Sequence, residues 1–372
     1  MNNNNVNIEI TNMKKLFSPL LRKLEYIEKD NEYVDEDKKK SNKFISRVVE
    51  NKFISTNEIK INDIIREIPY YQHRYNILYN YKPLALGEFD RKLVYNNSNK
   101  SKDIDYFLFQ FKNEKFITFN ENLFLLKTPK SLIFFVTETF TFLLTSLIEL
   151  RSHNICFFDL SHKNIVLPFE CREKPVLTHF QNSLLLLGDI NNELTISKII
   201  ENINDYTYKP LEIFVLFYLF KNNLNTISYA TIEEISEFYT KSLTVLKLFS
   251  LEYQNNFKLL CIKSLKRYIN KHKKDIVCEI LRHSYTWENY SLCLLYLHIV
   301  GNMLRVFSCK NTFISVFVGI LAKNISPEPS DREKLEITLE KYGNLYYKFS
   351  DWSFVNKISQ EKMCSLLKIL SE

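Results

Sequence analysis

Two polar side chains that could do chemistry lie in one apolar stretch, residues 157–167. Asp159 carries a carboxylate that can accept a proton, and Asn164, five positions later, carries an amide oxygen that can bind a divalent cation. The same residue types also stabilise turns by hydrogen-bonding to nearby backbone, so the spacing alone leaves a structural role open. Whether the role is chemical depends on the other elements of the chain.

Composition indicates an ordinary globular protein with enough residues for two lobes. The 372 residues are 45% hydrophobic and 25% charged, with a formal net charge of +7. Seven scattered cysteines form no C-x-x-C pair, so we expect reduced thiols in a cytoplasmic protein, without a zinc site or a disulfide framework. The most apolar window, residues 132–150, contains two glutamates and four threonines, which favours a buried core helix over a membrane span.

The order of elements predicts an α+β chain. After a polar extension over residues 1–43, we expect a small lobe over 44–115, with strands at 44–49, 75–78 and 106–111. Ser55 to Glu58 has the form of a capping box, which predicts a helix that Pro69 closes. Residues 116–372 are predicted to be mainly helical, beginning with a long helix through Leu150. Two apolar strands, 165–167 and 184–187, are predicted to form a hairpin directly after the Asp159 stretch.

Four more elements follow in the same direction along the chain. An acidic residue, Asp189, comes directly after the second hairpin strand. Pro210 and Glu212 stand at the start of a strongly apolar helix, and Trp287 and Glu288 open another buried helix. A late segment, residues 327–332, has two prolines and ends at Arg332. Five elements in a fixed order are far more specific than any one of them.

Together these elements resemble the eukaryotic-type protein kinase fold over roughly residues 44–348. The chain is similar, more narrowly, to the divergent kinase-like proteins of large cytoplasmic DNA viruses, which tend to carry a P-L-E element and a long helical insertion. The resemblance implies a bilobal fold with a reduced β-rich lobe and an expanded helical lobe. It also implies a site for ATP and Mg²⁺ and a role for each matching residue. These are Asp159 as catalytic base, Lys163 as a cation near the transferred phosphoryl group, Asn164 and Asp189 as metal ligands, Arg47 with Glu58 (or Glu67) as the phosphate-binding pair, and Pro210, Glu212, Trp287, Glu288 and Arg332 as structural residues, Arg332 pairing with Glu212.

Several positions depart from the family's pattern. No glycine precedes Gly87, so the glycine-rich phosphate loop is missing, and Arg47 replaces the usual lysine. Asp189 is followed by Ile and Asn in place of Phe and Gly, Glu288 replaces an Asp, and Ser161 replaces a Lys. Phe157 and Phe158 replace the His and the Arg that precede the catalytic Asp, and that Arg normally binds a phosphorylated activation segment.

The sequence therefore predicts a protein kinase that transfers phosphate to Ser or Thr of a protein substrate. The alternative is a pseudokinase that acts as a protein-binding scaffold. A basic helical insertion over residues 253–283 is either a solvated helix face or a docking surface for an acidic partner. Nucleic-acid binding is a third, weaker interpretation, and we expect no membrane association. We expect the protein in the cytoplasm, or in the host cytoplasm or virion if it is viral.

Overall fold

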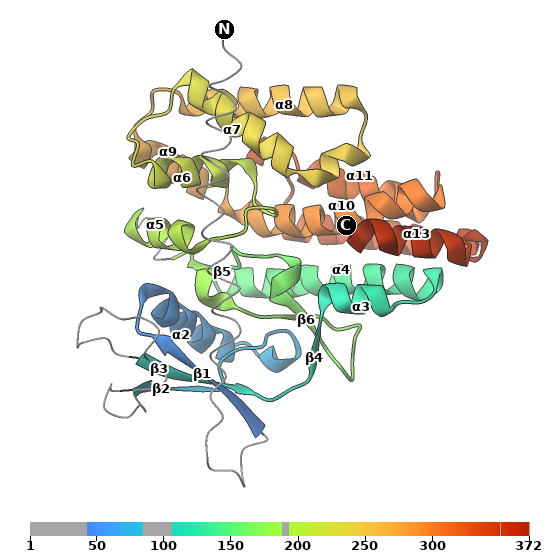
Figure 1. Ribbon diagram of the computed structural model, residues 1–372, viewed down its shortest axis with the longest axis horizontal. Helices are drawn as coiled ribbons and strands as arrows, with labels where there is room; N and C mark the ends of the chain where they lie inside the picture. Colours follow the sequence, from blue (N-terminus) through green and yellow to red (C-terminus); the bar gives the residue numbers. More distant parts are fainter. Residues whose placement is uncertain (1–42, 85–105, 188–192, 350, 372) are drawn as a thin grey trace. The chain divides into compact units, whose positions relative to one another are not determined.

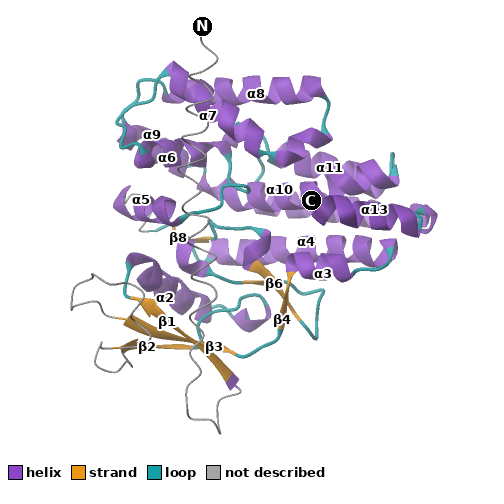
Figure 2. Ribbon diagram, viewed as in Figure 1, coloured by secondary structure: helices purple, strands orange, loops and turns teal. Residues whose placement is uncertain are grey.

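The computed structural model describes residues 43–84, 106–187, 193–349 and 351–371 (Figure 1). The chain divides into two compact units. The first contains residues 1–59 and 78–113, and the second contains residues 60–77 and 114–372. Short strands and many helices are present (Figure 2), in agreement with the predicted α+β class.

The first unit contains a three-stranded antiparallel sheet with the strand order β1-β3-β2. Its strands are β1 (Phe44–Glu50), β2 (Asn80–Leu84) and β3 (Tyr106–Lys112), so the strands expected at 44–49 and 106–111 are confirmed. Alternation in β3 points Phe109 inward, where it is fully buried, and places it opposite Arg47 of β1. Aromatic and β-branched residues thus build this sheet, as their strand propensity indicates.

The strand expected at 75–78 is wrong. Tyr75 forms only an isolated bridge with Leu177, and the next strand of the sheet begins at Asn80. Tyr75 is instead a buried anchor of the second unit, since its hydroxyl donates a hydrogen bond to the carbonyl of Ser146 at 2.7 Å. Residues 75, 77 and 78 are all buried, so their apolar character reflects burial rather than strand pairing.

The capping box expected at Ser55 is also wrong. Helix α2 (Phe53–Arg66) begins two residues earlier, so Ser55 lies inside its first turn. Its hydroxyl accepts a hydrogen bond from the N–H of Lys52 at 2.9 Å and donates to the carbonyl of Glu50 at 2.6 Å. Ser55 therefore stabilises the helix start from the third helical position, because a hydroxyl there reaches back to the unpaired groups that precede the helix.

Four helices with aromatic side chains form the core of the second unit. They are α4 (Pro129–Ser152), α10 (Trp287–Phe307), α11 (Phe313–Asn324) and α12 (Leu335–Lys348). The ring of Phe140 in α4 lies 4.9 Å from each of three rings, those of Tyr296, Phe317 and Tyr342. These edge-to-face contacts join the four helices through a cluster of buried aromatic rings. The other helices are α3 (Phe119–Leu125), α5 (Glu193–Asn202), α6 (Leu211–Lys221), α7 (Tyr229–Ser242), α8 (Leu251–Leu265), α9 (Lys273–Leu281) and α13 (Gln360–Ser371).

Two helical segments, Pro129–Ser152 and Ser284–Phe307, are long and apolar enough to cross a membrane by length and composition alone. In the protein, 61% and 78% of their most apolar windows are buried against other parts of the chain. Threonine side chains in α4 bond back to its own carbonyls, as that of Thr139 does to Phe135 at 2.6 Å. Both segments thus serve as core helices of the second unit.

Small strands position the Asp159 stretch within the second unit. Strand β5 (Ile155–Cys156) pairs antiparallel with β8 (Leu184–Leu185), and β6 (Ile165–Pro168) lies between β4 (Phe116–Thr118) and β7 (Val176–Leu177). The expected hairpin between residues 165–167 and 184–187 is therefore wrong, because these two segments do not pair with each other. The strand after the stretch pairs with β7, while the second apolar run pairs with the strand that precedes Asp159.

Candidate active site

Buried aromatic side chains fix the loop that carries Asp159. The ring of Phe157 packs against Phe180 with centroids 5.0 Å apart, and the ring of Phe158 packs against Trp287 at 5.2 Å. Both phenylalanines are buried, and the following side chain, Asp159, is 22% exposed. The apolar residues before Asp159 thus act as anchors that present its carboxylate at the surface of the second unit.

Two donors hold the Asp159 carboxylate, one on each oxygen. The ammonium of Lys209 donates to Oδ1 at 2.8 Å, and the amide of Asn182 donates to Oδ2 at 2.9 Å. Asn182 is itself oriented, because its Oδ1 accepts a hydrogen bond from Asn202 at 2.8 Å. Since each oxygen accepts a hydrogen bond from a different residue, the two donors hold the Asp159 carboxylate in one orientation.

Sequence reasoning missed Lys209, Asn182 and Asn202. Lys209 immediately precedes Pro210, the residue at the start of α6, and its side chain is only 1% exposed. A lysine directly before a strongly apolar helix was the available signal, because a lysine is rarely buried without an anionic partner. The two asparagines carried no signal in an asparagine-rich chain.

Asn164 is buried, and its side chain bonds within its own loop. The hydroxyl of Ser161 donates to Oδ1 of Asn164 at 2.6 Å, and the N–H of Thr178 donates to the backbone carbonyl of Asn164 at 3.0 Å. Ser161, which stands where the family pattern has a lysine, therefore fixes the Asn164 amide. An amide oxygen has two lone pairs, so Oδ1 keeps one acceptor site after this bond.

Lys163 pairs with Asp205 rather than with Asp159. Its ammonium lies 3.1 Å from the carboxylate of Asp205, and its side chain is 64% exposed. Burial disfavours a charged carboxylate at Asp205, but hydrogen bonds from Thr207 and the Lys163 ammonium outweigh burial and lower the pKa of Asp205. The structure therefore pairs Lys163, the cation predicted near the phosphoryl group, with Asp205. A different cation, Lys209, pairs with Asp159.

Glu288 holds the loop from the first turn of α10. Its Oε1 accepts a hydrogen bond from the backbone N–H of Phe157 at 3.1 Å. Its Oε2 lies 3.2 Å from the guanidinium of Arg151, and both side chains are largely buried. A glutamate thus reaches the backbone of the loop, where the family pattern has an aspartate.

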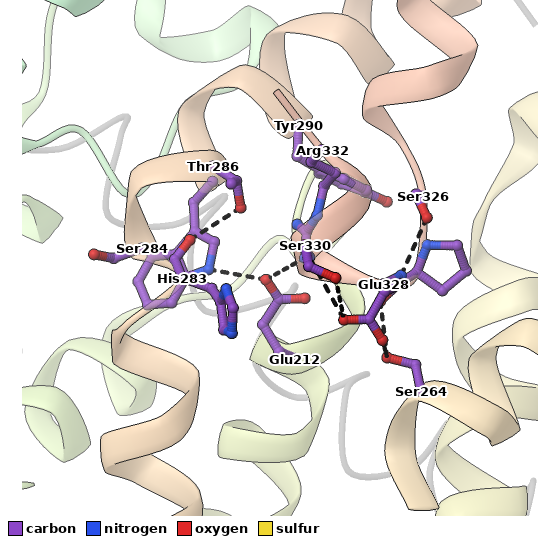
Figure 3. Close-up of polar contacts among 12 residues, drawn as sticks. Glu212, Ser264, His283, Ser284, Thr286, Tyr290, Ser326, Glu328, Ser330 and Arg332 are labelled. Atoms are coloured by element: carbon purple, nitrogen blue, oxygen red, sulfur yellow. Dashed lines mark hydrogen bonds and ion pairs between the residues drawn. The ribbon is translucent and has the colours of Figure 1, made fainter. Parts of the chain in front are cut away.

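The structure also brings Arg332 and Glu212 together (Figure 3). Nη2 of Arg332 donates to Oε1 of Glu212 at 2.6 Å, and the indole N–H of Trp287 donates to the same oxygen at 3.0 Å. Figure 3 shows Glu328 beside this pair, where it accepts hydrogen bonds from Ser264 and Ser330. Pro210 is the N-cap of α6, one turn from these contacts. Two of the predicted structural residues, Trp287 and Arg332, thus donate to the buried carboxylate of a third, Glu212.

In the first unit, Arg47 lies 3.5 Å from the carboxylate of Glu58. The guanidinium stacks over the rings of Phe109 and Phe111, at 5.9 and 5.6 Å from their centroids. Burial raises the pKa of Glu58 to about 7, and the charge of Arg47 opposes that rise. The pair forms with Glu58 of α2 rather than with the alternative, Glu67, which lies just beyond the helix end.

The described residues supply only part of a magnesium site. Asp189 lies outside them, and Asn164 contributes one amide oxygen. Within the described ranges, no group of three His, Cys, Asp or Glu side chains could hold a metal ion.

Internal ion pairs engage much of the basic insertion. Lys258 pairs with Glu237, Arg267 with Glu328, and Lys271 with Glu279 at 2.7 Å. Lys273 pairs with Glu193 at 3.0 Å and lies over the ring of Phe220. These contacts favour the solvated helix face over a docking surface for an acidic partner, since they neutralise four of its cations.

No family model matches the chain, and no curated protein sequence matches it. Solved structures similar to it include titin kinase with its flanking domains, at 12% identity and a TM-score of 0.39, covering 87% of this chain and 46% of that one. The kinase region of twitchin from C. elegans is 10% identical with a TM-score of 0.42, and the match covers 88% of this chain and 45% of that one. This chain therefore spans less than half the length of these two structures. The autoinhibited serine kinase domain of titin is 12% identical with a TM-score of 0.38, and the match covers 82% of this chain and 79% of that one. Identities and TM-scores this low assign no activity to the chain.

Proposed function

We propose that this chain is a protein-kinase-like phosphotransferase that moves the γ-phosphoryl group of ATP to a Ser or Thr hydroxyl of a protein. The observation that carries the proposal is the Asp159 carboxylate, held by Lys209 at 2.8 Å and by Asn182 at 2.9 Å on a loop that Glu288 fixes. A partly exposed carboxylate held in one orientation by two buried donors is suited to accept a proton from an incoming hydroxyl.

The second support is the conjunction of sequence order and contacts. The elements that resemble a kinase in order also touch in the fold, since Glu288 reaches the Asp159 loop and Arg332 reaches Glu212. Contacts that span 131 and 120 residues are not a consequence of local sequence. In the first unit, the Arg47–Glu58 pair provides the cation that the resemblance assigns to phosphate binding.

Bound ATP with Mg²⁺ would supply the transferred phosphoryl group and neutralise its charge. The chain's own residues would do the rest. Asp159 would accept the hydroxyl proton, Asn164 would offer its remaining amide lone pair to the metal, and Asp189 is the further ligand that the resemblance implies. We also propose that the chain is similar to viral kinase-like proteins and that it acts in the cytoplasm. The seven unpaired cysteines agree with a reducing compartment.

A scaffold without catalysis is the second candidate, and two observations favour it. Asn164 is buried and already bonded to Ser161, and the sequence lacks the glycines that would lay backbone amides over phosphates. In this case the same loop would hold the fold together, and partner proteins would bind elsewhere on the surface.

One experiment separates the two candidates. Purified protein is incubated with [γ-³²P]ATP and Mg²⁺, with and without a generic basic substrate, and ATP binding is followed in parallel by thermal shift. The phosphotransferase proposal predicts labelling that Asp159→Asn abolishes. Absence of labelling together with a thermal shift by ATP supports the scaffold, and absence of both contradicts any nucleotide-dependent role.

A further inference from the structure

Among the described residues, the buried side chain of Lys209 has one anionic partner. Its side chain is 1% exposed, its Nζ donates to Asp159 at 2.8 Å and to the carbonyl of Phe158 at 3.1 Å, and it lies over the Phe158 ring. Removing a lysine from water is costly unless an opposite charge and further acceptors replace the lost hydration. The burial of Lys209 therefore depends on the acceptors that Asp159 and Phe158 supply.

Within the loop that carries Asp159, residues 157–167, no positively charged side chain pairs with the Asp159 carboxylate. Ser161, two positions later, bonds to Asn164, and Lys163, four positions later, pairs with Asp205. Lys209 comes from 50 residues further along the chain, from the segment just before α6. A positive charge thus reaches Asp159 from a position that none of the recognised motif residues occupies.

We infer that Lys209 is a positioning residue for phosphoryl transfer, which holds the Asp159 carboxylate in one orientation while remaining too buried to touch the substrate. This inference rests on the proposed function. In the reaction, the substrate hydroxyl proton passes to Asp159 as the hydroxyl oxygen forms the new P–O bond. ADP leaves with the electron pair of the broken P–O bond. Each Asp159 oxygen accepts one hydrogen bond and keeps one acceptor site, so the carboxylate can still take that proton.

The kinetic test compares Lys209→Met and Lys209→Arg with the wild type in kcat and KM for ³²P transfer from ATP at one pH. Loss of the ammonium is expected to lower kcat on the order of 10²-fold while the KM for ATP stays within about twofold of the wild type. Lys209→Arg keeps a charged donor for the Asp159 carboxylate, so it should recover part of the lost kcat. A merely structural role would change KM together with kcat, or would leave Lys209→Arg as slow as Lys209→Met, and either result would contradict the inference.

A stability cycle tests the same pair without using activity. Asp159→Asn leaves the ammonium buried and unpaired, so it should lower Tm by roughly 5–10 °C. The double variant Asp159→Asn, Lys209→Met removes both charges and should recover at least half of that loss. Losses that simply add, or a double variant that fails to fold, would show that the pair does not act as a unit.

The two proposals fail in different ways. A wild-type protein that transfers no phosphate contradicts the proposed function, and the role of Lys209 in that reaction falls with it, whatever the stability cycle shows. An active wild type whose kcat survives Lys209→Met contradicts only the role of Lys209.

Discussion

The carboxylate of Glu288 accepts the backbone N–H of Phe157 at 3.1 Å and faces the guanidinium of Arg151 at 3.2 Å. Phe157 begins the loop that presents Asp159, and Arg151 lies in the last turn of α4. One buried side chain therefore ties the helix before the loop, the loop itself and the start of α10. This tie therefore supports the position of Asp159 from outside the loop, in addition to the buried rings of Phe157 and Phe158.

Glu288→Gln should destabilise the protein by about 3–5 kcal/mol. The amide can still accept the Phe157 N–H, but the charge that compensates buried Arg151 is lost. Urea unfolding measures the change, and Glu340→Gln, at an exposed position of α12, provides the matched control within about 0.5 kcal/mol of wild type. Equal stability of the two variants would show that the Arg151 charge needs no partner.

The Arg332–Glu212 pair should be strongly coupled. Both side chains are almost completely buried, so Arg332→Met should cost about 3–5 kcal/mol in the free energy of unfolding. The double variant with Glu212→Gln should cost less than the sum of the single variants. Arg267→Met is the control, because its pair with Glu328 is partly exposed and should contribute about 1 kcal/mol or less. Additive losses at Arg332 and Glu212 would contradict this coupling.

Glu58 should make stability fall as pH rises from 4.5 to 7. Burial raises the pKa of Glu58 to about 7 from the ordinary 4.5, so in this window the folded chain binds a proton that the unfolded chain has released. Relative to Glu58→Gln, the free energy of unfolding of the wild type should fall by on the order of 3 kcal/mol between pH 4.5 and pH 7. Above pH 7 the difference should change little. Urea unfolding of both proteins at pH 4.5, 6 and 8 measures the difference. Parallel pH curves would mean that Glu58 titrates normally.

Activity should not depend on phosphorylation between Asp189 and Glu212. The residue before Asp159, which the family pattern has as Arg, is Phe158, and its ring packs against Trp287 at 5.2 Å. An aromatic ring cannot form the ion pairs through which a phosphate orders such a segment. Phosphatase treatment should therefore leave the transfer rate within about twofold of the untreated protein. A loss that preincubation with ATP restores would contradict this expectation.

The sequence predicted the elements whose pattern is local. Strands β1 and β3 and helices α4, α6 and α10 lie where alternation, helical spacing and Pro210 placed them. Regular periodicity suffices for these, because each follows from the burial of one face. The helix start at Phe53 was missed since Ser55 can stabilise a helix either from the N-cap or from the third position.

Long-range pairings were beyond the sequence. Residues 184–185 are as apolar as the strand at 176–177, so composition could not decide which would follow the Asp159 loop as a hairpin partner. The Lys209–Asp159 pair joins residues 50 positions apart, and the place of Lys209 before an apolar helix does not reveal its partner. The kinase resemblance predicted Lys163 near the transferred phosphoryl group, whereas its ammonium pairs with Asp205.

The most direct measurement is the initial rate of ³²P transfer from ATP with Mg²⁺ by the wild type and by Asp159→Asn, each at a temperature where circular dichroism shows it folded. Asp275→Asn, an exposed residue of α9, is the matched control. A positioned general base predicts a rate at least about 10²-fold lower for Asp159→Asn and unchanged for Asp275→Asn. A folded Asp159→Asn variant that transfers phosphate at the wild-type rate would contradict the assignment of Asp159 as the catalytic base.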